Sequence, residues 1–269
     1  MKRIILALIL PLSLLLSLLL SLQPLQPLQA QSTQVARLIP KVLRVLPHDA
    51  EAFTQGLLWH DGYLYESTGL YGESTLRRVD IESGALLESL SIDEAYFAEG
   101  LERVDDKLIQ LTWKAGVAFV YDLASFDLLD TIEYEGEGWG LCYDGRFLFM
   151  SDSTPYLSLR DAETFELIVR AAVTYQGQIV APQLLNELEC VGEHIYANAW
   201  NTDFIFRIDK WTGAVNAVID ASTLLTAAER ADQPAGGVLN GIAYNPESET
   251  FYITGKLWSK IFEVVFIAP

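Results

Sequence analysis

The sequence predicts an all-β fold, a five-bladed β-propeller, from three observations: a motif that occurs five times, β-rich segments after each copy, and a repeat spacing typical of propeller blades. The copies of the motif are Gln55-Gly56-Leu57, Glu99-Gly100-Leu101, Trp139-Gly140-Leu141, Asn186-Glu187-Leu188 and Asn240-Gly241-Ile242. Successive copies lie roughly 40 to 54 residues apart, which is the period of a propeller blade rather than of a helical repeat. A closed ring of blades brings equivalent positions to one central mouth, where Glu99 would be the only acidic first residue.

Each copy is predicted to begin an antiparallel unit of four strands. A run of aromatic and branched residues follows each copy, and in the first three copies it comes directly after an Asp-Gly or Asp-Asp turn. These returning strands are expected at residues 63–68, 107–112, 146–151, 194–199 and 250–254. Third strands are expected at residues 76–79, 118–121, 157–160, 204–208 and 261–266, and the first four of them lead through a turn to a fourth strand.

The two ends of the domain are expected to meet in the fifth unit. That unit stops after its third strand, so residues 41–46 should supply the missing fourth strand and remove a free sheet edge. One short helical insertion is expected between the fourth and fifth repeats, from Ser222 to Asp232, with Ser222 or Thr223 as its N-cap. We expect this insertion to fold over the ring.

The N-terminal segment indicates export. Residues 1–30 have the features of a signal peptide, with a basic start and an apolar run from Ile4 to Leu22. That run, about 19 residues, is also just long enough for an uncleaved membrane anchor, and Leu28 stands where a cleavage site prefers a small residue. Residues 31–40 are then a linker and residues 41–269 the propeller domain. The protein is expected in the periplasm or outside the cell, either free after cleavage or anchored to the membrane.

The charge and the cysteines narrow the range of partners. A net charge of −18 argues against binding to nucleic acid or to an anionic membrane surface. Cys142 and Cys190 are the only cysteines, and an exported protein could oxidise them. Strand alternation, however, places them on opposite faces of their blades. We therefore predict two buried thiols rather than a disulfide.

Two inner positions of each repeat should line the mouth: the first residue of the motif, and a residue about 12 to 15 positions later on the returning strand. Together they place Gln55, Glu99, Asn186, Asn240, Asp152 and Lys256 among Trp113, Trp139 and Trp200. Each has a simpler role open to it: tryptophans pack between blades, asparagines satisfy turn amides, and charged side chains are solvated. Their coincidence on the inner positions favours a small-molecule pocket with an aromatic wall.

The candidate chemistry is proton transfer by a carboxyl group. The three histidines show no metal-ligand spacing, and the sequence contains no nucleophile elbow, P-loop or dinucleotide fingerprint. This leaves Glu99 among the tryptophans. Apolar surroundings raise the pKa of a carboxyl towards neutrality, and a nearby lysine opposes that rise. The sequence leaves open whether Lys256 approaches Glu99.

The segments that carry these residues resemble the glutamine cyclotransferase family, the plant and bacterial type of glutaminyl-peptide cyclotransferase. The matching stretches are Pro47-His48-Asp49, Ala52-Phe53-Thr54-Gln55-Gly56-Leu57, Glu66-Ser67-Thr68-Gly69-Leu70-Tyr71-Gly72, Tyr96-Phe97, Glu99-Gly100-Leu101, Gly138-Trp139-Gly140-Leu141, Leu185-Asn186-Glu187-Leu188-Glu189, Val238-Leu239-Asn240-Gly241-Ile242-Ala243 and Thr254-Gly255-Lys256-Leu257-Trp258. They cover about Pro47 to Phe266. The chain departs from the family at Gly236-Gly237-Val238, where the family often has an acidic residue.

The resemblance implies a five-bladed propeller that converts an N-terminal glutamine of a peptide or protein to pyroglutamate and releases ammonia. Glu99 matches the catalytic glutamate, and the matched substrate-binding residues are Phe53, Gln55, Phe97, Trp113, Trp139, Asn186, Trp200 and Lys256. No metal or cofactor is expected, and the protein should be a monomer. Two alternatives remain open: a non-catalytic propeller that binds peptide termini or another exported protein, and a metal-dependent hydrolase, which the scarcity of histidine argues against.

Overall fold

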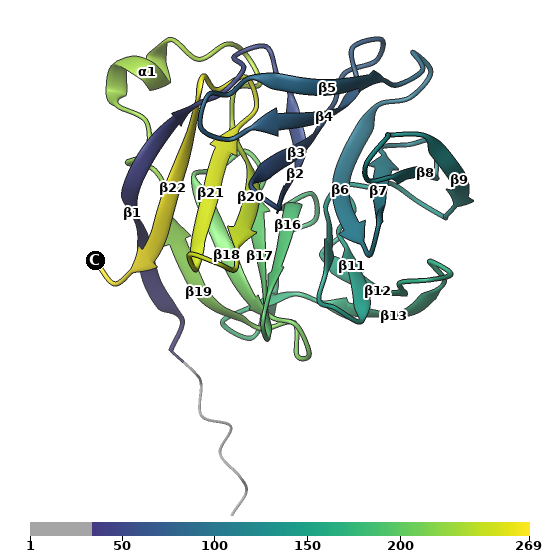
Figure 1. The fold of residues 1–269 in the computed structure, drawn as a ribbon. Helices are drawn as coiled ribbons and strands as arrows, with labels where there is room; N and C mark the ends of the chain where they lie inside the picture. The colour runs from purple at the N-terminus through teal and green to yellow at the C-terminus, as the bar shows by residue number, and fades with distance from the viewer. Residues whose placement is uncertain (1–33) are drawn as a thin grey trace, which may run out of the picture. The chain divides into compact units, whose positions relative to one another are not determined.

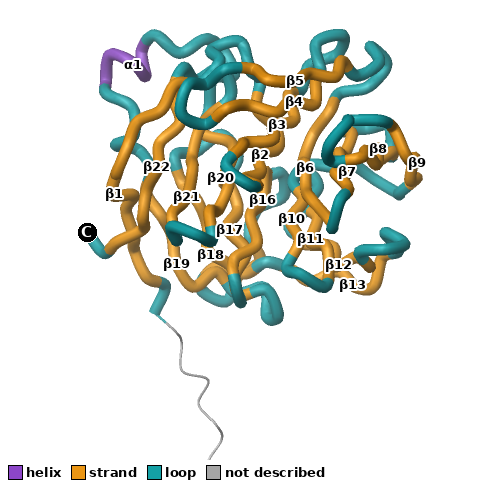
Figure 2. Tube along the Cα trace, viewed as in Figure 1, coloured by secondary structure: helices purple, strands orange, loops and turns teal. Residues whose placement is uncertain are grey.

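The computed structural model describes residues 34–269, so the predicted signal peptide or anchor lies outside the described residues. Gln34–Pro269 form one compact unit built of β-strands with one short helix, as the colours of Figure 2 show. The prediction of an all-β fold is confirmed. Within this part of the chain, no helix is long and apolar enough to cross a membrane.

Three consecutive stretches of the chain each fold into a four-stranded antiparallel sheet with its strands in sequence order (Figure 1). The first sheet contains β2 (Thr54–His60), β3 (Tyr63–Thr68), β4 (Thr75–Asp80) and β5 (Leu86–Ser91). The second contains β6 (Ala98–Val104), β7 (Lys107–Thr112), β8 (Val117–Asp122) and β9 (Leu128–Glu133). The third contains β10 (Leu141–Tyr143), β11 (Phe147–Met150), β12 (Tyr156–Asp161) and β13 (Leu167–Ala172). A small hairpin that the sequence did not predict, β14 (Thr174–Tyr175) with β15 (Gln178–Ile179), follows them.

The remaining strands form one eight-stranded sheet made of two four-stranded halves. One half contains β16 (Leu185–Val191), β17 (His194–Ala199), β18 (Phe204–Asp209) and β19 (Val215–Asp220). The other contains β20 (Leu239–Asn245), β21 (Thr250–Gly255), β22 (Lys260–Ile267) and β1 (Ala36–Pro47).

Strand β1 connects the two halves because it pairs on both sides. Ala36–Leu38 run parallel to β19, and Ile39 to Pro47 run antiparallel to β22. The N-terminal segment therefore completes the fifth unit, which confirms the prediction for residues 41–46. The strand begins at Ala36, inside the segment predicted as a linker.

The hydrophobic core lies in five clusters, one between each pair of neighbouring units. The first strands contact one another in a cycle, β2 with β6, β6 with β10, β10 with β16, β16 with β20, and β20 with β2. Strand alternation explains this layering, because successive side chains point to opposite faces. On β2, for example, Leu57 enters the cluster shared with β20–β22, whereas Leu58 enters the cluster shared with β6–β9.

Cys142 and Cys190 form a disulfide, so the prediction of two free thiols is wrong. Cys142 lies on β10 and Cys190 on β16, and both belong to or pack on the same core cluster between their sheets. The two cysteines do lie on opposite faces of equivalent strands. Neighbouring sheets stack with the front of one against the back of the next, however, so opposite faces meet.

The helical insertion lies where it was predicted, between the fourth and fifth units, but it is shorter. Helix α1 spans Ala227–Ala231, and its N-cap is Thr226, not Ser222 or Thr223. Thr226 and Glu229 form a capping box, which explains the late start. The preceding apolar pair, Leu224 and Leu225, is buried in the core cluster between the fourth and fifth units.

Candidate active site

The first residue of the motif lies at a strand irregularity in four of the five units. The pairing of β2 with β3 shifts register between Thr54 and Gly56, and that of β6 with β7 between Ala98 and Leu101. The same occurs between Leu185 and Leu188 on β16, and between Leu239 and Ile242 on β20. Bulges re-aim side chains and often lie next to active sites. Gln55, Glu99, Asn186 and Asn240 are thereby taken out of the regular ladder, and all four are buried.

The glycines of the motif permit close approach of neighbouring first strands. A Cβ atom added to Gly56 would lie 2.4 Å from the backbone nitrogen of Leu101, and one added to Gly140 would lie 2.2 Å from the carbonyl oxygen of Asn186. The Gly100 amide donates to the carbonyl oxygen of Trp139 at 2.7 Å. Because these positions carry no side chain, the motif residues of adjacent units come close together.

Glu99 is a buried carboxyl group, with 4% of its surface exposed. The Gln55 Nε2 atom donates a hydrogen bond to its Oε1 atom at 3.1 Å. Burial raises the pKa of Glu99 well above its usual value, the positive charge of Lys256 opposes the rise, and the negative charge of Glu137 adds to it. Glu99 is therefore a buried carboxyl group that holds its proton to a higher pH than an exposed glutamate, which suits a general acid or base.

Lys256 is the cationic partner of Glu99, which answers a question that the sequence left open. It is as buried as Glu99, and burial lowers its pKa to about 8, although the Glu99 carboxylate opposes the decrease. Its Nζ atom lies 4.8 Å from the centroid of the Phe53 ring, a cation–π contact. The site thus contains a carboxyl group and an amino group that are buried to the same extent.

The predicted aromatic residues form two contacting groups. Phe97 packs edge-on against Phe53 at 6.2 Å and against Trp113 at 5.5 Å between ring centroids. Trp139 and Trp200 form the second group, with their ring centroids 5.8 Å apart. Trp200 is 40% exposed, so this wall reaches solvent, whereas Trp139 is buried. The second group thus runs from a buried ring at Trp139 to a partly exposed ring at Trp200.

Glu137 joins the two aromatic groups, and the sequence analysis missed it. Its Oε2 atom accepts hydrogen bonds from the indole nitrogens of both Trp113, at 3.2 Å, and Trp139, at 3.0 Å. The available signal was its place two residues before Trp139. One carboxylate thus sets the orientation of two rings and adds negative charge near Glu99.

The two asparagines differ in what they contact. The Asn240 amide nitrogen donates to the backbone oxygen of Thr54 at 2.9 Å, so Asn240 supports the bulge that carries Gln55. Within residues 34–269 the Asn186 side chain makes no hydrogen bond, which leaves its amide for a ligand. Asp152 lies on the inner position but its carboxylate binds Thr154 and Arg170 instead.

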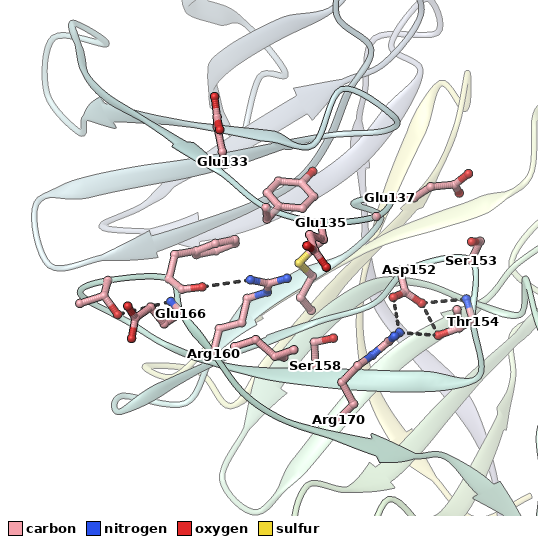
Figure 3. Close-up of a pocket in the computed structure, with 16 residues that line it drawn as sticks. Glu133, Glu135, Glu137, Asp152, Ser153, Thr154, Ser158, Arg160, Glu166 and Arg170 are labelled. Atoms are coloured by element: carbon pink, nitrogen blue, oxygen red, sulfur yellow. Dashed lines mark hydrogen bonds and ion pairs between the residues drawn. The ribbon is translucent and has the colours of Figure 1, made fainter.

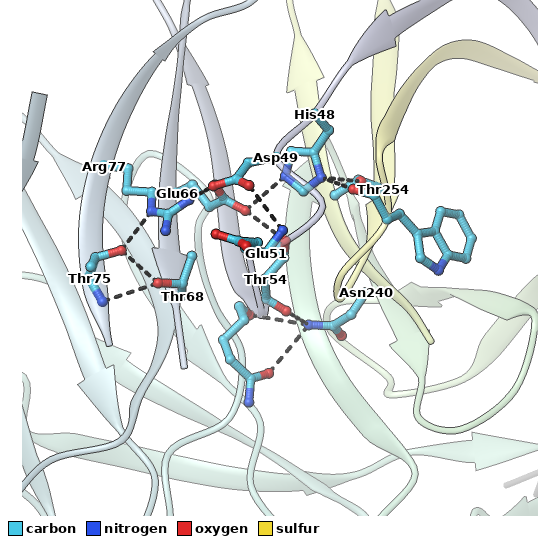
Figure 4. Close-up of polar contacts among 12 residues, drawn as sticks. His48, Asp49, Glu51, Thr54, Glu66, Thr68, Thr75, Arg77, Asn240 and Thr254 are labelled. Carbon is cyan, nitrogen blue, oxygen red and sulfur yellow. Dashed lines mark hydrogen bonds and ion pairs between the residues drawn. The ribbon is translucent and has the colours of Figure 1, made fainter. Parts of the chain in front are cut away.

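A second polar network holds β2 from the other side (Figure 4). The Glu66 Oε1 atom accepts from the Thr54 hydroxyl at 2.6 Å and contacts His48 Nε2 at 3.0 Å, and His48 Nδ1 lies 2.6 Å from the carbonyl oxygen of Trp258. Burial lowers the pKa of His48, but the Glu66 charge and these hydrogen bonds raise it overall. Both ring nitrogens face acceptor oxygens, and through these contacts His48 ties the first and last units together.

Comparison with known proteins gives one consistent result. The family model described as glutamine cyclotransferase matches residues 14–266. A curated glutaminyl-peptide cyclotransferase from Arabidopsis thaliana is 37% identical over 226 residues, which are 83% of this chain and 70% of the relative. The crystal structure of Myxococcus xanthus glutaminyl cyclase superposes with a TM-score of 0.80 at 39% identity, covering 87% of this chain and 98% of that one.

The fold and the site together define a class of protein: an all-β enzyme with a buried acid among aromatic side chains. The chain belongs to the glutamine cyclotransferase family. The resemblance predicted from the sequence is confirmed.

Proposed function

We propose that this protein is a glutaminyl-peptide cyclotransferase, which converts the N-terminal glutamine of peptides or proteins to pyroglutamate and releases ammonia. The observation that carries the proposal is the buried Glu99, held by Gln55 and flanked by Lys256 between two aromatic walls. Family membership supports the same reaction.

The reaction requires no enzyme nucleophile. The substrate's α-amine attacks the carbon of its own side-chain amide, and a carbon–nitrogen bond forms while the carbonyl oxygen gains negative charge. Glu99 accepts a proton from the attacking amine and delivers it to the departing amide nitrogen, which leaves as ammonia when the carbonyl re-forms. Glu99 ends in its starting state, so one carboxyl serves both proton transfers.

Lys256 is the group we assign to the developing oxyanion. Its charge is desolvated, and buried charges stabilise a new negative charge more strongly than exposed ones. The unpaired Asn186 amide is a second donor, whereas Gln55 already donates to Glu99. The rings of Phe53, Phe97, Trp113, Trp139 and Trp200 hold the glutamine side chain folded back on its own amine, the orientation that an intramolecular attack needs.

Release of ammonia from a Gln-Ala dipeptide, followed by coupled assay and by the mass of the product, tests the proposal. An N-acetylated control peptide, which lacks the attacking amine, should release none. Binding of the dipeptide without release at any pH would instead support a non-catalytic peptide-binding protein. Loss of activity with a chelator would favour the metal-dependent hydrolase.

We further propose that the five units are the blades of a five-bladed propeller. The cycle of contacts among β2, β6, β10, β16 and β20 and the core cluster between each neighbouring pair support this arrangement. Closure by β1, which joins the two ends of the chain in one sheet, supports it as well.

Export as a monomer is the last part of the proposal. The Cys142–Cys190 disulfide fits an oxidising compartment, and the apolar run from Ile4 to Leu22 fits a signal peptide or an anchor. Cell fractionation with mass measurement of the mature chain distinguishes cleaved from anchored protein. Sedimentation of the purified protein tests the monomer.

A further inference from the structure

A cavity of about 720 Å³ opens beside the candidate active site, between the loop after β9 and the sheet β10–β13 (Figure 3). It shares two residues with the surroundings of that site. Glu137 lines the cavity and also binds the indoles of Trp113 and Trp139. Tyr134 lines it too; burial raises the pKa of Tyr134 to about 12, and the neighbouring Glu99 carboxylate contributes to the rise. A peptide whose first residue occupies the active site therefore has this cavity within its reach.

The floor of the cavity carries a buried charge without a counter-ion. Arg160 is only 7% exposed, and Figure 3 shows its guanidinium pointing into the cavity. Its Nη1 atom donates to the carbonyl oxygen of Phe165 at 3.0 Å, and the guanidinium lies over the rings of Phe165 and Tyr134. Within residues 34–269 it forms no ion pair, and its Nε atom has no hydrogen-bond partner.

The other arginine of the cavity differs from Arg160 in having a counter-ion. Arg170 lines the same space, but it is paired with Asp152. Buried charges are as a rule paired, because an unpaired one keeps most of its desolvation cost. Ser158, also buried on the cavity wall, has a hydroxyl that makes no hydrogen bond within the described part of the chain. Arg160 and Ser158 together offer the donors that a carboxylate accepts.

The rim of the cavity has the opposite sign, with Glu133, Glu135 and Glu166 exposed around it. These carboxylates repel free anions, so small anions from solution should not accumulate at Arg160. A carboxylate attached to a peptide that is already held at the active site does not depend on such capture, because its effective concentration is high.

We propose that the cavity binds the part of the substrate that follows the N-terminal glutamine, and that Arg160 there pairs with a carboxylate of the peptide. This inference rests on the proposed function and names a substrate class: glutamine peptides that carry an acidic side chain a few residues on, or short peptides that end in a free carboxylate. Arg160 is thus a specificity-determining residue.

Amidated peptides with glutamine first and alanine after it provide the test. In the first series one alanine at a time is replaced by glutamate, and in the second, matched series by glutamine. In the third series, peptides of increasing length are compared with a free and with an amidated C-terminus. For wild type, kcat/KM should be about tenfold higher with the carboxylate at one position than with its neutral partner, as expected for a charge-assisted hydrogen bond. The first two series detect an acidic side chain and the third a terminal carboxylate.

The variant Arg160→Gln should reduce that ratio to about one. Arg146→Gln is the matched control, because Arg146 lies over Phe147 outside the cavity and should leave the ratio at the wild-type value. Since Arg160 also packs on Phe165, Ser158→Ala serves as a second variant that keeps this packing and should lower the ratio partway. Equal rates for every acidic and neutral pair in wild type, or an unchanged ratio in Arg160→Gln, would overturn the inference.

Failure of the proposed function would look different. No ammonia would be released from any peptide, neutral ones included. Fluorescence titration of the same peptides would then measure the same preference as a ratio of Kd values, and equal Kd values for acidic and neutral peptides would overturn the inference directly.

Discussion

Glu99 and Lys256 are buried to the same extent and can carry opposite charges, and within residues 34–269 neither has a full set of hydrogen-bond partners. Burial favours the neutral form of each side chain, whereas the attraction between the two charges favours the charged forms. Because the folded-state pKa of Glu99 lies above its usual 4.5, folding stability falls as pH rises through that interval. The site therefore keeps a reactive carboxyl at a cost in stability, as active sites often do.

We expect Glu99→Gln to lose at least about 100-fold in kcat, because an amide cannot carry the proton from the amine to the leaving nitrogen. The variant should still bind a glutamine dipeptide and remain folded, although the buried Lys256 then loses its charged neighbour. Ammonia release and chemical denaturation measure the two effects. An active Glu99→Gln protein would show that another group carries the proton.

The pH dependence of kcat/KM should be bell-shaped. Activity rises as pH increases through the raised pKa of Glu99, because only the carboxylate accepts a proton, and it falls above about 8, where Lys256 loses its charge. Lys256→Arg should retain its charge and move the falling limb to higher pH. A falling limb that stays in place in Lys256→Arg contradicts the role given to this lysine.

At the scale of the strand, glycine and bulge act together. The bulges on β2, β6, β16 and β20 turn one side chain of each strand out of the ladder. The motif glycines Gly56, Gly100 and Gly140 let the first strands of adjacent units approach. The repeat seen in the sequence is thus a packing motif, and its first residue is free to vary. That freedom allows one copy to carry Glu99 while another carries Asn240, which supports the backbone of Thr54.

Gly140→Ala should lower the free energy of unfolding by about 2 kcal/mol or more, since the added carbon would overlap the carbonyl oxygen of Asn186. Gly145→Ala is the control. Its added carbon would meet nothing within 4 Å, so it should cost only the strain of a positive φ, about 1 kcal/mol. Urea denaturation compares them, and equal losses would show that close approach is not what the motif glycine provides.

At the scale of the whole molecule, three interactions join the units. Strand β1 pairs with both the fourth and the fifth unit. The His48–Glu66 pair links the first and fifth units, and the disulfide links the third and fourth. Each connects segments far apart in the sequence. The packing of the units against one another therefore depends on several independent contacts.

The disulfide closes a loop with a sequence separation of 48 residues. Replacing both cysteines, Cys142→Ala with Cys190→Ala, should lower the free energy of unfolding by about 2–4 kcal/mol, chiefly because the unfolded chain regains freedom. Denaturation of wild type with and without reductant should show a similar difference, and the double variant none. Identical stability of oxidised and reduced wild type would contradict a stabilising bond.

The alternation of apolar residues, the turn signals and the five-fold motif determined the strands, because their periods reflect local backbone geometry. Phe53 and Phe97 were named only from the family resemblance, whereas the other residues named for the site could be found in the same way, since repeats place them at equivalent positions. Glu137 could not, because its two tryptophan partners come from different units. Neither could Arg160, whose significance lies in the absence of a partner, which only packing reveals.

The sequence by itself determined the all-β class, the repeating units, the closing role of the N-terminal strand and the identity of the candidate acid. Only the tertiary structure decided the pairing of Cys142 with Cys190, the proximity of Lys256 to Glu99 and the start of the helix at Thr226. The reason is the range of the interactions. Strands and turns follow from neighbours along the chain, whereas bonds and charges between units depend on which faces of neighbouring units pack together.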